Sequence, residues 1–149
     1  MQTVRDYNPR PYYAKPDIWQ QIGIAERGPK LYQALHQGFN YQVFDKLAAL
    51  STLDKKQLAA VCQLAPATLA RRARSGRFTQ DESDRLYRFA TVFAAASSLF
   101  DGDSAAIKGW LTQPVYGLGD QAPIEMLATS AESQAVLDLI GRLEHGVFS

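Results

Sequence analysis

The stretch from Asp54 to Phe78 limits the possible folds most, because it predicts two short helices joined by a tight turn. Asp54 and Gln57 are spaced as an N-terminal cap, and apolar residues follow at helical intervals. A second helix is predicted to begin at Pro66, since proline is tolerated at the first helical position and disfavours helical geometry in the residue before it. The two segments predict a helix-turn-helix, in which Gln63 stands at a turn position that commonly holds glycine.

Arginines gather at the end of the second predicted helix, and between Gln57 and Gln80 the sequence has no acidic residue to neutralise them. Leu69 and Ala73 are four residues apart and are predicted to face the core, which leaves the polar side chains on the outer face. Arginine binds phosphates and also takes the O6 and N7 atoms of guanine together in the major groove. The residues predicted to contact DNA are therefore Thr68, Arg71, Arg72, Arg74, Ser75 and Arg77.

Arg71 and Arg72 are the candidates for contact with bases or phosphates, and the other four side chains are expected to support them along the DNA backbone. One small helix-turn-helix reads too few base pairs to be specific, so a homodimer on a palindromic site is expected. The alternative interpretation is a helical hairpin whose arginines form a solvated face, because paired helices with a short turn occur in many all-helical proteins.

Charge is distributed unevenly along the 149 residues, although the net charge is only +1. Residues 1–100 hold 14 Lys and Arg and 8 Asp and Glu, a net charge of +6. Residues 101–149 hold 2 and 7, a net charge of −5. The two parts are therefore expected to meet different partners, with a polyanion at the basic end.

No feature of the sequence indicates an enzyme, a cofactor or a metal site. The sequence has no phosphate-binding glycine loop, no paired metal ligands, and no Ser or Cys placed with a His in a recognisable arrangement. Cys62 is the single cysteine and is expected to be a buried structural thiol. No apolar run approaches about eighteen residues and no secretory signal is recognised, so no membrane partner and a cytoplasmic location are expected.

Residues 1–38 are predicted to form an N-terminal arm rich in proline and aromatic residues, followed by a first helix from Pro29 to Gln37. The arm carries four large aromatic side chains, which is more than a solvated linker holds: Tyr7, Tyr12, Tyr13 and Trp19. It is therefore expected to pack on its own chain or on a second subunit. A basic arm that follows DNA is the alternative.

The remaining sequence predicts further helices, so the fold class is all-α. Residues 39–100 are assigned to the helix-turn-helix domain, which ends in a long helix that begins at a Thr79–Glu82 capping box. Residues 101–149 are assigned to a small helical C-terminal domain. This domain is predicted to comprise a short helix, an irregular loop and a last helix that stops at Gly146.

Two blocks of the chain carry a recognisable pattern. The first runs from Thr68 to Ala96 and reads TLARRARSGRFTQDESDRLYRFATVFAAA; the second runs from Trp110 to Ser149 and reads WLTQPVYGLGDQAPIEMLATSAESQAVLDLIGRLEHGVFS. They resemble, respectively, the recognition and "ESDRL" helices and the toxin-binding domain of Xre/ParS/MbcA-type antitoxins, whose partner toxins carry a RES domain. Some positions depart from the family pattern, which often has Asn near Val115 or Tyr116, a second Gly at Asp120, and Gly near Glu132 or Ser133.

The resemblance implies an antitoxin that neutralises a RES-domain toxin through its C-terminal domain and binds the promoter of its own operon through the helix-turn-helix. Toxins of this kind degrade NAD. The toxin-facing positions carried over to this sequence lie in the loop and at the chain end: Pro114, Leu118, Gly119, Pro123, Arg142, Glu144, His145, Gly146, Val147, Phe148 and Ser149. The acidic segment with an apolar end is also suited to cover a basic nucleotide site, so the tail is hypothesised to block the toxin's cleft, with its carboxylate in place of a substrate phosphate.

Two other classes of function stay open from the residues alone. A free-standing transcriptional regulator would use residues 101–149 to dimerise or to sense a ligand. An adaptor without a DNA role would leave the arginines as solvated charge. A neighbouring gene for a small RES protein would favour the antitoxin over both.

Overall fold

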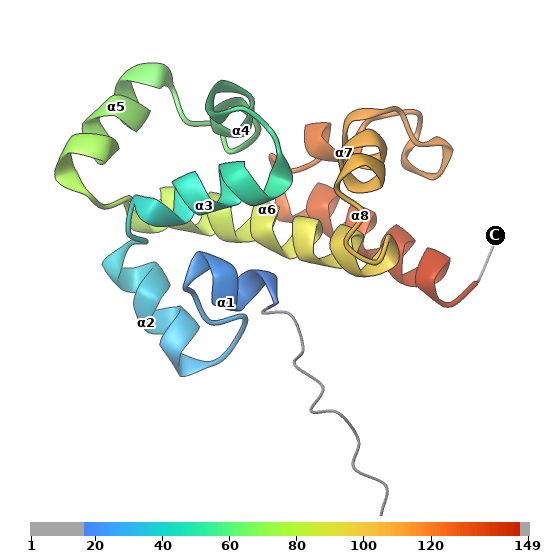
Figure 1. The fold of residues 1–149 in the computed structure, drawn as a ribbon, viewed down its shortest axis with the longest axis horizontal. Coiled ribbons are helices and arrows are strands. Elements are labelled where there is room, and N and C mark those ends of the chain that lie inside the picture. Colours follow the sequence, from blue (N-terminus) through green and yellow to red (C-terminus); the bar gives the residue numbers. More distant parts are fainter. Residues whose placement is uncertain (1–16, 147–149) are drawn as a thin grey trace, which may run out of the picture.

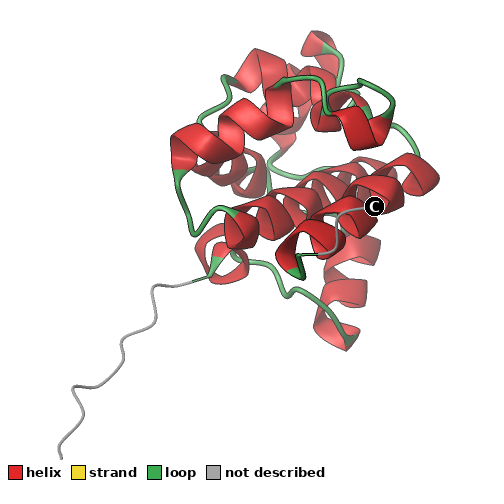
Figure 2. Ribbon diagram, turned by 90° about the vertical axis from the view of Figure 1, so that its right-hand side faces the viewer, coloured by secondary structure: helices red, strands yellow, loops and turns green. Residues whose placement is uncertain are grey.

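The computed structural model describes residues 17–146, and within this range it contains helices, turns and loops but no strand (Figure 2). The all-α fold class predicted from the sequence is therefore confirmed. The helices and two 3₁₀ turns follow one another in the order α1 (Ile18–Ile22), α2 (Pro29–Gln37), α3 (Gln42–Ser51), α4 (Lys55–Val61), α5 (Pro66–Ser75), α6 (Gln80–Leu99), α7 (Ser104–Thr112), η2 (Tyr116–Leu118), η3 (Pro123–Glu125) and α8 (Ser130–Glu144).

The longest helix, α6, organises the fold. Its 20 residues begin at the predicted capping box, in which the Thr79 hydroxyl accepts the Glu82 N–H and the Glu82 carboxylate accepts the Thr79 N–H. In Figure 1, α3, α4 and α5 lie on one side of α6, α1 and α2 lie on the other, and α7 and α8 lie near its C-terminal half. Every α-helix except α5 contributes a buried residue to one continuous hydrophobic cluster. The helix-turn-helix and the C-terminal helices therefore share one core through α6.

The predicted helix-turn-helix is present as α4 and α5. The Asp54 carboxylate accepts the Gln57 N–H at 2.6 Å and caps α4, and Pro66 opens α5 as expected. Gln63 in the turn has a φ of 57°, the left-handed conformation that costs a residue other than glycine some backbone strain. Cys62 beside it is buried, as predicted, and burial raises the pKa of its thiol to about 12. This thiol packs in the core and stays protonated at neutral pH.

The first described residues pack on their own chain. Trp19 in α1 is buried, and its ring lies 5.5 Å from the Tyr87 ring of α6, centroid to centroid. The Tyr87 hydroxyl donates a hydrogen bond of 2.7 Å to the Glu26 carbonyl oxygen, which holds the segment after α1 against α6. For Trp19, the expectation that the arm packs on its own chain is therefore confirmed. Tyr7, Tyr12 and Tyr13 lie outside the described residues.

Gly38 allows two distant segments to meet beside α5. Its φ is 87°, and an added Cβ atom would overlap the Phe78 carbonyl oxygen. The backbone N–H of Phe78 donates to the Phe39 oxygen at 2.8 Å, and the N–H of Tyr41 donates to the Gly76 oxygen at 2.9 Å. This short antiparallel contact fixes the C-terminal end of α5 to the start of α3. It is formed only because residue 38 has no side chain.

Gly38→Ala is therefore expected to destabilise the protein by about 4 kcal/mol, since it combines backbone strain with a clash against a main-chain atom. Gly28→Ala is the matched control, because Gly28 has a similar φ of 89° but no atom within 4 Å of an added Cβ. Strain alone is expected to cost about 2 kcal/mol there. Thermal unfolding should place Tm of the Gly38 variant roughly 4–8 °C below that of the Gly28 variant. Equal Tm values would contradict the close approach.

Candidate functional site

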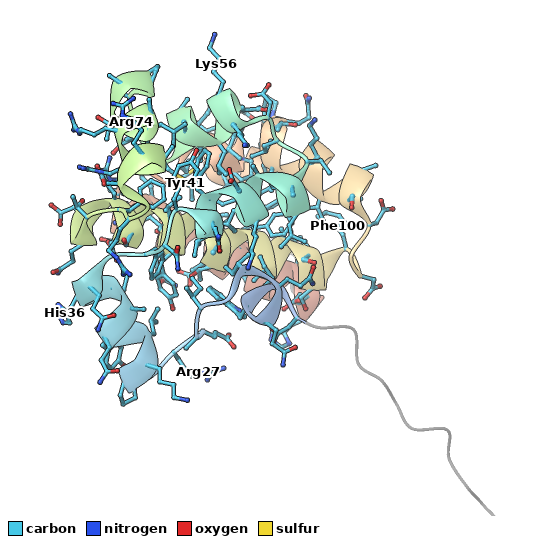
Figure 3. The ribbon with its side chains drawn as sticks, turned by 60° about the vertical axis from the view of Figure 1, so that its left-hand side comes forward. Arg27, His36, Tyr41, Lys56, Arg74 and Phe100 are labelled. Atoms are coloured by element: carbon cyan, nitrogen blue, oxygen red, sulfur yellow. The ribbon has the colours of Figure 1, made fainter. Side chains whose placement is uncertain are left out.

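The outer face of α5 presents a stripe of small and basic side chains. Ala67, Ala70, Arg71 and Arg74 are spaced three, four and seven residues apart and are all exposed, so they share one face of the helix. Figure 3 shows Arg74 on the outer side of α5, directed away from the body of the protein. Among the described residues, no ion pair or hydrogen bond engages the Arg71 or Arg74 side chain. These two guanidinium groups are the cations of α5 that are free to bind an external anion.

Arg72 lies on the inner face of α5, which contradicts its predicted place beside Arg71. Its Nε atom is 2.7 Å from Oε1 of Glu82, and its Nη2 atom is 3.1 Å from Oε2 of the same carboxylate. The side chains of Arg72 and Glu82 are only 20% and 7% exposed. Arg72 follows Leu69 by three residues and so shares its face, whereas Ala73, which was predicted to face the core, is exposed.

The Arg72–Glu82 pair also corrects the expectation that no acid neutralises the arginine cluster, because Glu82 lies just beyond the acid-free stretch. Burial by itself raises the pKa of the Glu82 carboxyl, but hydrogen bonds from Arg72 and from the Thr79 backbone outweigh it and lower that pKa below its usual range. The same hydrogen bond raises the pKa of Arg72. The pair is therefore charged at neutral pH.

The stability that Glu82 contributes is expected to depend on pH. A carboxyl whose pKa is lowered by folding stabilises the native state above its unfolded pKa, about 4.3, and this stabilisation is lost as the pH falls through the lower native value. The Tm of the wild type should therefore exceed that of Glu82→Gln by a constant amount from about pH 7 to pH 5. The difference should shrink below about pH 4, as measured by thermal scans of both proteins. A difference unchanged at pH 3 would contradict the assignment.

The other predicted DNA-binding residues lie at the edges of the stripe. Arg77 donates a hydrogen bond of 2.7 Å from Nη1 to the Gly38 carbonyl oxygen, although its residue is exposed overall. The Ser75 hydroxyl lies 3.3 Å from the carbonyl oxygens of Arg72 and Arg77, so it completes the end of α5. Thr68 is partly buried. These three side chains flank the stripe rather than form it.

Two arginines of α6, not among the predicted site residues, hold the surrounding loops. Arg85 donates from Nη1 to the Gln63 carbonyl oxygen at 2.7 Å, which satisfies the end of α4 in the turn of the helix-turn-helix. Arg88 donates to the carbonyl oxygens of Leu127 and Ala128 at 3.0 and 3.3 Å, just before α8. Both parts of the chain are therefore tied to the same helix by charged side chains.

The loop between α7 and α8 has an inner and an outer side. Leu118 and Pro123 are buried, so these two predicted toxin-facing residues shape the loop from beneath. Pro114 and Gly119 are exposed, and Gly119 has a φ of 65°. Tyr116 is 91% exposed, more than any other large hydrophobic residue in the described range, and it is not among the residues predicted from the sequence.

The last turn of α8 is also open to solvent. Four of the predicted toxin-facing residues are exposed there: Arg142, Glu144, His145 and Gly146. The structure thus places four predicted residues on one accessible helix end. Val147, Phe148 and Ser149 lie outside the described residues.

Neither a membrane span nor a metal site is found in residues 17–146. No helix there has the length and apolar character needed to cross a bilayer. No group of three or more His, Cys, Asp and Glu side chains in that range is arranged to hold a metal ion.

Comparison with known proteins places both halves of the chain in one family. Residues 30–90 match the antitoxin Xre-like helix-turn-helix domain, and residues 95–146 match the antitoxin Xre/MbcA/ParS C-terminal toxin-binding domain, so the two matches meet within α6. The protein named "Antitoxin Xre" from Yersinia enterocolitica is 38% identical, with 98% of this chain and 100% of the relative covered. Its namesake from Photorhabdus laumondii is 33% identical with the same coverage.

A third "Antitoxin Xre", from Pseudomonas putida, is 34% identical over 68 residues, which cover 46% of this chain and 42% of that protein. The two relatives that align along almost the whole chain carry the assignment, together with the two domain matches. The chain belongs to the Xre/MbcA/ParS antitoxins and is a binding protein in which an Xre-like helix-turn-helix precedes a C-terminal toxin-binding domain.

Proposed function

We propose that this antitoxin neutralises a cognate RES-domain toxin that degrades NAD and binds operator DNA to regulate its own operon. The toxin-binding part is residues 101–149 and the DNA-binding part is residues 39–100. The observation that carries the proposal is the match of residues 95–146 to a toxin-binding domain, directly after a helix-turn-helix whose outer face is basic. Both NAD and the operator are intracellular, so the protein acts in the cytoplasm.

On the DNA side, the stripe of Ala67, Ala70, Arg71 and Arg74 enters the major groove. Arginine is suited to guanine O6 and N7, and an alanine methyl group packs against the methyl group of thymine. The face holds no Asn or Gln to read adenine and no acid to read cytosine. Operator half-sites are therefore rich in guanine and thymine on the strand that α5 contacts, and a homodimer places two copies of α5 on a palindrome.

The remaining predicted residues support this contact at its edges. Thr68, Ser75 and Arg77 flank the stripe and lie where the DNA backbone would pass. One N–H group of Arg77 donates to the Gly38 carbonyl oxygen, and the other N–H groups of this guanidinium can bind a phosphate. Contacts of this kind set the register of the protein on DNA and add affinity without selecting bases.

On the toxin side, the contact surface comprises the outer side of the α7–α8 loop and the end of α8. Pro114, Tyr116 and Gly119 supply exposed loop surface, and Leu118 and Pro123 hold its shape from below. Arg142, Glu144, His145 and Gly146 continue this surface toward the chain end. Residues 101–149 as a whole carry a net charge of −5, which suits a toxin whose NAD site must be basic to bind the dinucleotide's phosphates. The tail from Val147 to Ser149 would cover that site.

Co-expression with the product of the adjacent gene tests the proposal. The full-length antitoxin is captured by affinity, and NAD consumption by any copurified partner is measured with and without the antitoxin. Copurification with suppressed NAD loss is expected. A chain that ends at Gly146 tests the tail in the same assay, and full neutralisation by it would remove the tail from the mechanism. If no partner is captured and nothing is inhibited, the toxin proposal fails and a free-standing regulator becomes the better account.

A further inference from the structure

We propose that the Arg72–Glu82 ion pair positions α5 for DNA binding, so that Glu82 is required for operator affinity although its charge repels DNA. This inference rests on the proposed function at the operator. It assigns Arg72 a positioning role, in place of the DNA contact predicted from the sequence. It also gives a function to an acidic residue that lies beside a DNA-binding surface.

The helix that carries the reading stripe is the one helix without a buried residue in the described chain. Leu69 packs against the core but is only partly buried. The C-terminal end of α5 is tied down by the Tyr41–Gly76 hydrogen bond and by Arg77 on the Gly38 oxygen. Apolar burial is therefore too small to fix how far α5 is rotated about its own axis.

The ion pair supplies this missing constraint. Two N–H···O hydrogen bonds of 2.7 and 3.1 Å join the Arg72 guanidinium to both oxygens of the Glu82 carboxylate, and such a fork fixes orientation as well as distance. Glu82 is itself held, because its Oε1 atom accepts the Thr79 N–H at 2.9 Å within the capping box of α6. Because Glu82 is fixed at the start of α6, the ion pair fixes the orientation of α5 relative to α6. Arg72 and the stripe lie on opposite faces of α5, so a rotation that breaks the pair also turns Arg71 and Arg74 out of line with the groove.

The Glu82→Gln variant distinguishes a positioning role of Glu82 from the repulsion between its negative charge and DNA. Glutamine keeps an acceptor for the Thr79 N–H, since Gln is also a capping-box residue, so the start of α6 is preserved while the ionic pair is lost. Removal of a negative charge near DNA would, by electrostatics alone, tighten binding. The positioning role makes the opposite prediction. Asp81→Asn is the charge-matched control, because Asp81 is an exposed acid on the adjacent position of α6.

The experiment measures the affinity of full-length proteins for a fluorescent duplex from the promoter upstream of their own gene, over a range of salt concentrations. Glu82→Gln is expected to bind about tenfold more weakly than the wild type, the value of one charge-assisted hydrogen bond. Asp81→Asn should bind equally or more tightly. Arg72→Gln should lose about the same affinity as Glu82→Gln, and the double variant should lose no more than either single variant. Glu82→Gln binding as tightly as Asp81→Asn would overturn the proposal.

Salt dependence separates positioning from a direct phosphate contact by Arg72. A phosphate contact made by Arg72 itself would lower the slope of log affinity against log salt in Arg72→Gln alone, by about one per site, whereas a lost positioning contact changes the slope of Arg72→Gln and of Glu82→Gln alike. Equal slopes for the two variants are expected, and a reduced slope for Arg72→Gln together with a fully active Glu82→Gln would assign Arg72 to DNA instead. Capture of the toxin by each variant confirms that the rest of the protein is folded.

Hydrogen exchange on the free protein tests the same inference without DNA. Amides of α5 should exchange faster in Glu82→Gln than in the wild type, while those of α8 are unchanged. Unchanged exchange in α5 would overturn the positioning role. If the wild type does not bind the promoter duplex at all, the proposed operator function fails, and hydrogen exchange still decides whether the pair holds α5.

Discussion

Replacing Arg71 and Arg74 together by alanine is expected to weaken operator binding by at least about 100-fold, while toxin capture stays unchanged. One good contact of arginine with a guanine or a phosphate is worth roughly a factor of ten or more, and two are lost on each copy of α5. Stability should change little, because both side chains are exposed and engage no partner in the described structure. Fluorescence anisotropy with the promoter duplex measures the loss.

Arg27→Ala with Lys30→Ala is the matched control for this double variant. It removes the same number of positive charges from two exposed residues, Arg27 just before α2 and Lys30 in its first turn. In Figure 1, α2 lies across α6 from α5, and Figure 3 likewise shows Arg27 and Arg74 well separated. A specific contact by α5 predicts that the control binds the duplex almost normally. Equal losses of affinity in the two double variants would mean that only net charge attracts DNA and that α5 makes no specific contact with it.

Base analogues then distinguish reading from simple phosphate binding. Replacing guanine by 7-deazaguanine removes the N7 acceptor, and replacing thymine by uracil removes the methyl group, without altering the backbone. Wild-type affinity should fall with 7-deazaguanine in the half-site, and the Arg71 and Arg74 variant should be insensitive to it. Full wild-type affinity for both analogue duplexes would limit the stripe to phosphate contacts.

The helix boundaries could be predicted from the sequence because their signals are local. Asp54, Thr79 and Thr129 each accept the backbone N–H three residues later, at the starts of α4, α6 and α8. Such a cap depends only on residues within one turn, so it can be recognised without the fold. The left-handed conformation of Gln63 follows in the same way, because a turn that short leaves few backbone options.

The assignment of the two faces of α5 required the tertiary structure. Leu69 pairs at helical spacing with both Arg72 and Ala73, and periodicity alone favours the apolar alanine as the inner neighbour. Arg72 occupies the inner face of α5 because the capping box of α6 places Glu82 opposite it. Glu82 lies ten residues later in the sequence. A short helix that buries little apolar surface is positioned by such a polar contact, which no local pattern encodes.

The sequence pattern likewise could not predict which residues of the toxin-binding loop are buried and which are exposed. Leu118 and Pro123 belong to the loop motif that resembles the family, but the loop folds so that both are covered. Gly117 lets this turn lie close against α8, since an added Cβ would stand 3.2 Å from a methyl carbon of Leu139. The neighbouring Tyr116 is 91% exposed. The sequence of the loop alone does not reveal which of its residues are covered and which are open to solvent.

Tyr116→Ala is expected to weaken toxin binding by about 30-fold or more and to leave operator affinity unchanged. A tyrosine that is almost fully exposed in the free protein buries a large rigid surface when a partner covers it, and such residues dominate binding energies. The loss should appear mainly as faster dissociation of the complex, measured by surface-based binding kinetics with the copurified toxin. Incomplete suppression of NAD loss at limiting antitoxin should accompany it.

Tyr32→Ala provides the matched control. Tyr32 on α2 is the other exposed large hydrophobic residue of the described chain, at 57%, and it lies outside the match to the toxin-binding domain. If the toxin contacts the α7–α8 loop, this variant should dissociate at the wild-type rate. Normal dissociation of Tyr116→Ala combined with fast dissociation of Tyr32→Ala would move the toxin interface to α2, which lies within the match to the helix-turn-helix domain. Normal dissociation of both variants would leave the exposed end of α8 as the main toxin contact.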